Sequence, residues 1–212
     1  MTDLGTTRPG AHEASAPGFG RDEETIFVAD WLSGLFIAPL DEGAIEAYRS
    51  GPAAALLFEI AEAFGCPEAG RRLDAVLASG EAHAVAGELS RQYTRLFDGL
   101  GGPQTIALYE SATRGGHRLF QEPFAEMQAV LRHLDVAVGQ ACPEPADHLS
   151  IELAAFAAAM RQGDGVMAAA LAQRLNGWVP PLAEAIAKAD PEGFYGAAGL
   201  ILAGFLRTLS CH

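Results

Sequence analysis

The sequence predicts an all-α protein, folded as a single globular bundle of about ten helices. Apolar residues recur at the three- and four-residue spacing of amphipathic helices along most of the chain. Hydrophobic residues make up 50% of the 212 residues, but alanine supplies much of this fraction and aromatic residues only 8%. A β-sandwich would need more Val, Ile, Thr and Tyr, and no segment shows a convincing strand pattern.

Gly and Pro residues divide the first half of the chain into five expected helices. The first starts at Asp22 with acidic residues in its first turn, where the helix dipole favours them, and Pro39 stops it. The others cover 41–48, 52–64, 67–78 and 81–97. The fifth has one apolar face, made of Val85, Leu89, Tyr93, Leu96 and Phe97, and it ends at the Gly-rich loop 99–103.

The second half of the chain predicts five more helices, over 120–138, 147–160, 166–177, 182–188 and 191–209. Segment 139–146 contains Pro143 and Pro145 and reads as a linker between the first two. We expect a break or a kink at Pro180 and Pro181, because proline cannot donate the backbone hydrogen bond of a helix. The linkers are short, so neighbouring helices are expected to pack together.

Composition excludes several classes of protein. The formal net charge of −13 disfavours a nucleic-acid-binding protein, and an acidic surface would attract a basic partner. No segment approaches the roughly 18 apolar residues of a membrane span, and the N-terminus does not resemble an export signal.

Residues 1–20 are expected to form a disordered tail, and 21–212 the folded domain. The cysteines are Cys66, Cys142 and Cys211, and their number and spacing indicate reduced cytosolic thiols.

Three segments resemble the TorD/DmsD family of redox-enzyme maturation chaperones, which is related to the NarJ-type assembly proteins. Segment 93–99 (YTRLFDG), with 109–111 (YES) after it, resembles the family's aromatic-x-x-Leu-Phe-x-Gly signature. Segment 144–149 (EPADHL) resembles its Glu-Pro-x-Asp-His-Leu element at the head of a helix. The third segment comprises 178–180 (WVP) and the aromatic pair at 194–195. One departure is that Arg174 and Leu175 stand where the family often carries a His before the Trp-x-Pro.

The resemblance implies a cytoplasmic chaperone without enzymatic activity or cofactor. Its client would be the apo form of a DMSO- or TMAO-reductase-type molybdoenzyme, bound through its twin-arginine signal peptide and held for cofactor insertion before export. The chaperone would be a monomer or a domain-swapped dimer. Two alternatives remain open. One is a NarJ-like assembly factor for a nitrate-reductase-type catalytic subunit that is not exported. The other is a small helical metal-dependent hydrolase using His148, Glu152 and Cys142, although further metal ligands cannot be named.

A receptor for a twin-arginine leader needs an apolar groove with carboxylates at one end, because arginine pairs in a bidentate manner with carboxylates. The candidate carboxylates are Asp147, Glu144 and Glu110. The candidate apolar lining comes from Tyr93, Leu96, Phe97, Leu100 and Tyr109, with simple core packing as the alternative for Leu96 and Phe97.

Asp147 and His148 are the candidates with the most specific sequence context. On a helix that starts near Asp147, the stripe of large apolar residues faces the core, Asp147 lies opposite and His148 lies on the flank. The resemblance implies that both line the peptide-binding site. The alternative is that Asp147 caps the helix and His148 pairs with Glu144 or Glu152. The two interpretations are compatible, because a capping residue can border a groove.

Overall fold

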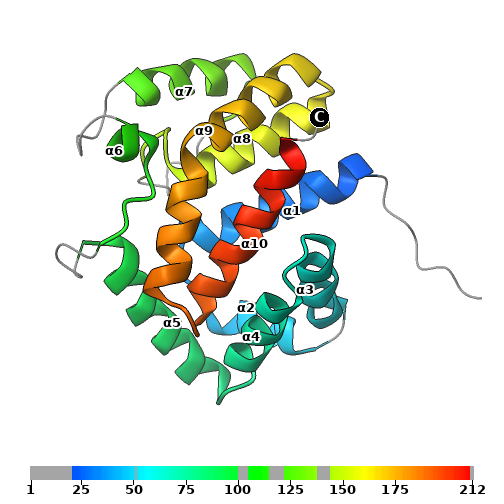
Figure 1. The fold of residues 1–212 in the computed structure, drawn as a ribbon, viewed down its shortest axis with the longest axis vertical. Helices are drawn as coiled ribbons and strands as arrows, with labels where there is room; N and C mark the ends of the chain where they lie inside the picture. The colour runs from blue at the N-terminus through cyan, green and yellow to red at the C-terminus, as the bar shows by residue number, and fades with distance from the viewer. Residues whose placement is uncertain (1–20, 51, 100–104, 115–121, 138–143, 211–212) are drawn as a thin grey trace, which may run out of the picture.

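The computed structural model describes residues 21–50, 52–99, 105–114, 122–137 and 144–210, and the predicted tail lies outside these ranges. Within them the protein has helices and no strand, which confirms the predicted all-α class (Figure 1). The helices are α1 (Arg21–Ile37), α2 (Glu42–Arg49), α3 (Pro52–Ala63), α4 (Pro67–Leu77), α5 (Ala82–Phe97), α6 (Glu110–Arg114), α7 (Glu122–His133), α8 (Leu149–Gln162), α9 (Gly165–Ala189) and α10 (Phe194–Leu209).

Several helix ends follow directly from local sequence signals. Asp41 caps α2, because its side chain accepts a 2.8 Å hydrogen bond from the backbone N–H of Ala44. Pro67 occupies the first turn of α4, where its missing N–H costs nothing. Gly163 ends α8 with φ of 71°, a left-handed conformation that favours glycine.

Of the break or kink expected at Pro180 and Pro181, the break is absent, because helix α9 continues through both prolines. The two helices predicted over 166–177 and 182–188 are therefore one, although its path bends along its length (Figure 1). An interior proline costs a helix about 3 kcal/mol or more. The burial of apolar side chains before and after the two prolines offsets this cost, since Trp178 and Leu182 both belong to the hydrophobic core.

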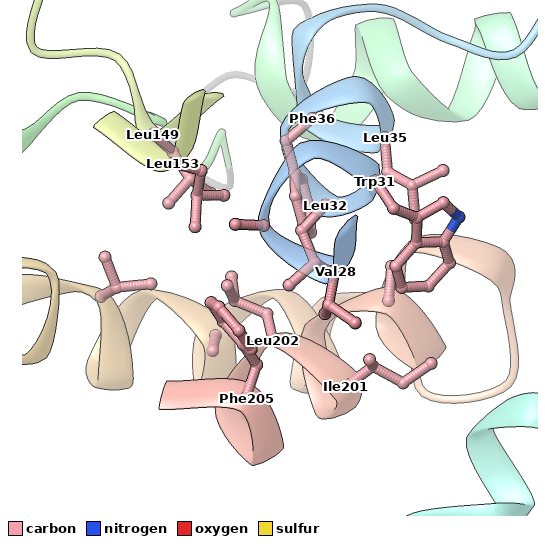
Figure 2. Close-up of a cluster of buried hydrophobic side chains, with 14 of the residues drawn as sticks. Val28, Trp31, Leu32, Leu35, Phe36, Leu149, Leu153, Ile201, Leu202 and Phe205 are labelled. Atoms are coloured by element: carbon pink, nitrogen blue, oxygen red, sulfur yellow. The ribbon is translucent and has the colours of Figure 1, made fainter. Parts of the chain in front are cut away.

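The centre of the core lies between α1, α8, α9 and α10. Helix α1 packs on α8, and α9 packs on both α8 and α10. Figure 2 shows the contact in which α1 turns one face toward both α8 and α10. The buried side chains there are Val28, Trp31, Leu32, Leu35 and Phe36 of α1, Leu149 and Leu153 of α8, and Ile201, Leu202 and Phe205 of α10. Each such side chain contributes about 1.5–3 kcal/mol of burial free energy.

The remaining helices lie on two sides of this centre (Figure 1). Helices α2 to α5 form one group, and α4 joins it to α10. Helices α6 and α7 lie on the other side, against α9 and α8 respectively. None of the helices in the described ranges is long and apolar enough to cross a membrane.

Candidate functional site

The two most specific sequence segments lie side by side in the structure. Tyr109 and His148 form an isolated antiparallel β-bridge between the segment before α6 and the segment before α8. The backbone N–H of Glu110 donates to the carbonyl of Asp147 at 3.0 Å, and that of Leu149 donates to the carbonyl of Leu108 at 2.8 Å. The bridge therefore brings Glu110, Asp147 and His148 together, although up to 38 positions separate them in the sequence.

Asp147 is fully buried, which differs from the outward position predicted for it. It is also not the cap of α8: its Oδ2 accepts a 3.0 Å hydrogen bond from the backbone N–H of Ser111, in the first turn of α6. Asp147 thus provides the acceptor for a backbone N–H that has no partner within α6, a helix far from Asp147 in the sequence. Its Oδ1 has no hydrogen-bond partner among the described residues.

His148 is the actual cap of α8. Its Nδ1 accepts a 3.1 Å hydrogen bond from the backbone N–H of Ser150, and its ring lies edge-on to Tyr109 at 5.1 Å between ring centroids. Burial lowers the pKa of His148 to about 4, against the opposing pull of Glu144 and Asp147. The ring is therefore neutral near pH 7, as a hydrogen-bond acceptor at Nδ1 must be. The predicted alternative of a His148 pair with Glu144 or Glu152 is replaced by this cap.

The neutral cap predicts a pH dependence of stability. The pKa of His148 is lower in the folded than in the unfolded protein, so its stabilisation is complete above about pH 6.5 and is lost as the pH falls toward about 4. Between pH 7 and pH 5, wild type is expected to lose about 1–2 kcal/mol more free energy of unfolding than His148→Asn, which keeps a capping acceptor but does not titrate. Urea unfolding of both proteins at pH 7 and pH 5 measures these losses. Equal losses in wild type and His148→Asn would contradict the prediction.

Tyr109 and Glu144 form the partly exposed rim of the site. The Tyr109 hydroxyl donates a 2.6 Å hydrogen bond to Oε2 of Glu144, and both residues are half-buried. Burial and this carboxylate both raise the pKa of Tyr109, so the hydroxyl keeps its proton at physiological pH. Glu144 is the candidate carboxylate that solvent reaches, whereas Glu110 and Asp147 are fully buried.

Behind the rim, a second buried carboxylate connects two helices. Oε2 of Glu152, in α8, accepts a 2.9 Å hydrogen bond from the indole N–H of Trp178, in α9. Its Oε1 accepts a 3.2 Å hydrogen bond from Nε of Arg174, one turn before Trp178. Burial raises the pKa of Glu152, and Arg174 opposes this shift.

Arg174 is the cation that the carboxylates of this cluster share, and the sequence analysis did not predict this role. Besides Glu152, its guanidinium pairs with Glu110 and, at 2.8 Å, with Glu126, and it donates to the carbonyl of Pro123 at 2.9 Å. It therefore connects α6, α7, α8 and α9. The only sequence signal was its position one turn before Trp178, in place of the His that the family often carries there.

The aromatic and aliphatic candidates belong largely to the core. Tyr93, Leu96 and Phe97 are 6%, 3% and 8% exposed. The Tyr93 hydroxyl donates to the carbonyl of Phe36 at 2.9 Å, and the Phe97 ring lies 5.4 Å from that of Tyr195. The structure thus places Leu96 and Phe97 as the core-packing alternative describes, with Tyr93 buried beside them, and Leu100 lies outside the described residues.

The side chains suggested for a metal site have other partners. Glu152 is held by Trp178 and Arg174, and Nδ1 of His148 caps α8. Cys142 lies outside the described residues. Across the ranges that the structure describes, no group of three or more His, Cys, Asp and Glu side chains is placed to hold a metal ion. Buried carboxylates paired with arginines are suited instead to binding guanidinium groups.

Comparison with known proteins places the chain in a family. Residues 59–184 match the family model described as nitrate reductase delta subunit. The chain is 31% identical to the chaperone protein TorD of Shewanella loihica over 174 residues, covering 78% of this chain and 82% of the relative. It is 30% identical to TorD of Aeromonas salmonicida over 189 residues (83% and 85%), and 25% identical to TorD of Vibrio parahaemolyticus over 205 residues (86% and 91%). The chain therefore belongs to the family of TorD-like maturation chaperones for redox enzymes.

Proposed function

We propose that this chaperone binds the twin-arginine signal peptide and the apo form of a DMSO- or TMAO-reductase-type molybdoenzyme. It would act in the cytoplasm and hold the precursor until the cofactor has been inserted, before export. The mechanism is reversible binding without chemistry. Burial of the leader's apolar stretch would supply affinity, at about 25 cal/mol per Å² before association costs.

The observation that carries this proposal is the gathering of acidic side chains around the Tyr109–His148 bridge. Glu110 and Asp147 lie within the site and Glu144 at its rim. Glu110 already binds guanidinium groups, since Arg114 and Arg174 both pair with it. The net charge of −13 would in addition attract a basic leader over a distance.

A second candidate is a NarJ-like assembly factor that serves a nitrate-reductase-type catalytic subunit without export. The observation that favours it is the matched family model, whose description is nitrate reductase delta subunit. Such a client would bind through its folded body or a segment without the arginine pair. The two candidates therefore differ in whether a twin-arginine peptide alone is bound.

Calorimetric titration with synthetic leader peptides tests the proposal. The peptides are the twin-arginine leaders of the molybdoenzymes encoded in the same genome, each paired with a twin-lysine control. Saturable binding of one leader, and weaker binding of its twin-lysine form, is the expected result. Absence of binding to every leader would reject the proposal and favour the NarJ-like candidate, to be tested with a cytoplasmic catalytic subunit.

Glu144→Gln tests the rim directly. The substitution removes a half-exposed negative charge but keeps an oxygen that can accept from the Tyr109 hydroxyl. We expect leader binding to weaken by about three- to tenfold, with little change in the free energy of unfolding. Glu184→Gln, at an exposed position of α9, is the control for the change in net charge. Equal affinities of the two variants would place the leader's arginines elsewhere.

A further inference from the structure

The Glu110 carboxylate is fully buried and yet paired with two arginines of its own chain. Its Oε1 accepts a 2.5 Å hydrogen bond from Nη1 of Arg114, and its Oε2 pairs with Nη2 of Arg174. A buried carboxylate without a counter-charge is costly. The protein therefore needs a cation at this position even when no client is bound.

The two arginines differ in how firmly they are held. The Arg174 side chain is 13% exposed and also contacts Glu126, Glu152 and the carbonyl of Pro123. The Arg114 side chain is 59% exposed, and Glu110 is its ion-pair partner within the described part of the chain. Arg114 can therefore leave for solvent with little further change, whereas removal of Arg174 would leave several groups unpaired.

Two residues that adjoin Glu110 carry buried oxygens that no described residue uses as a hydrogen-bond partner. The Oγ of Ser111 and the Oδ1 of Asp147 are buried and have no hydrogen-bond partner among the described residues. Ser111 follows Glu110 in the chain, and its N–H is bonded to the Asp147 carboxylate. A guanidinium has five N–H donors, of which Arg114 uses one in the contact with Glu110.

We propose that Arg114 is an internal ligand of Glu110, which an arginine of the client's leader displaces. The inference rests on the proposed function and concerns how affinity is set in that same site. In the exchange, one guanidinium replaces another at Oε1 of Glu110, while Arg174 stays paired with Oε2. Arg114 then acts as a built-in competitor that keeps leader binding weak enough to be reversed.

The test compares Arg114→Gln with Arg91→Gln by titration of the twin-arginine leader and its twin-lysine form. Arg91 is a matched control, because it is an exposed arginine paired with a glutamate three residues earlier, at 2.7 Å. Both variants change the net charge equally, so long-range attraction of the basic peptide rises equally. We expect Arg114→Gln to bind the twin-arginine leader about three- to tenfold more tightly than Arg91→Gln does.

Two further variants keep the test decisive if Arg114→Gln folds poorly. Arg114→Lys keeps the charge but lacks the planar fork, so its affinity for the leader is expected to lie between those of wild type and Arg114→Gln. In a Glu110→Gln background, Arg114→Gln is expected to change the affinity no more than Arg91→Gln does. Equal affinities of Arg114→Gln and Arg91→Gln would overturn this inference alone. Absence of leader binding in every variant, wild type included, would overturn the proposed function and the inference together.

Discussion

Arg174→Met is expected to lower the free energy of unfolding by about 3–5 kcal/mol, because it leaves Glu110 and Glu152 buried without their shared cation. Both carboxylates are fully buried, so water cannot take over the role of the guanidinium. The substitution would also release the contacts that hold Glu126 and the carbonyl of Pro123 of α7. Urea unfolding followed by far-UV circular dichroism measures the loss.

The control for Arg174→Met is Arg161→Met. Arg161 pairs with Asp30 between α8 and α1, but their side chains are 49% and 40% exposed. Exposed ion pairs contribute about 0–1 kcal/mol, so this variant should remain close to wild type. A loss in Arg174→Met no larger than that in Arg161→Met would show that the buried cluster does not need its arginine.

The destabilisation by Arg174→Met is also expected to depend on pH. Without the guanidinium, which opposes the effect of burial, the pKa of Glu152 rises further in the folded variant. The folded variant then binds more protons than its unfolded chain, and its stability improves as the pH falls. The difference from wild type should therefore be smaller at pH 5.5 than at pH 8, and a larger difference at the lower pH would contradict this account.

Gly196→Ala is expected to be the most damaging small substitution in the C-terminal helix. A Cβ atom at Gly196 would overlap the carbonyl oxygen of Asp190 and lie 2.7 Å from the carbonyl carbon of the same residue. Asp190 cannot easily move, because its Oδ2 accepts from the backbone N–H groups of Tyr195 (3.0 Å) and Gly196 (3.2 Å) at the start of α10. The clash therefore has to be relieved by moving backbone.

We expect Gly196→Ala to lose about 3 kcal/mol or more of the free energy of unfolding, at the upper end of overpacking effects. Gly34→Ala is the matched control, because Gly34 lies exposed in α1 and a Cβ atom there would meet nothing within 4 Å. That substitution should stabilise by about 0.5–1 kcal/mol through helix propensity. Urea midpoints of both variants test the pair, and a neutral Gly196→Ala would show that the α9–α10 turn adapts.

Most of the helices were predictable because their signals are local, but the short helix α6 was not among those predicted. The cap at Asp41, the proline at the start of α4 and the left-handed Gly163 each act within one turn of the residue concerned. Helix α9 shows the limit of this reasoning. Pro180 predicts a break from its own chemistry, but the burial of Trp178 and Leu182 in the core keeps the helix continuous.

The residues of the candidate site were predictable as types, but their environments were not. The sequence by itself determined which acidic and aromatic residues are neighbours along the chain, Tyr109 with Glu110 and Glu144 with Asp147, and it placed a helix start only near Asp147. Only the tertiary structure decided that Asp147 caps α6 rather than α8, and that Arg174 neutralises Glu110 and Glu152. The physical reason is that local signals such as helix caps depend on residues adjacent in the sequence. The burial of a carboxylate, and the cation that neutralises it, depend instead on which distant helices pack together.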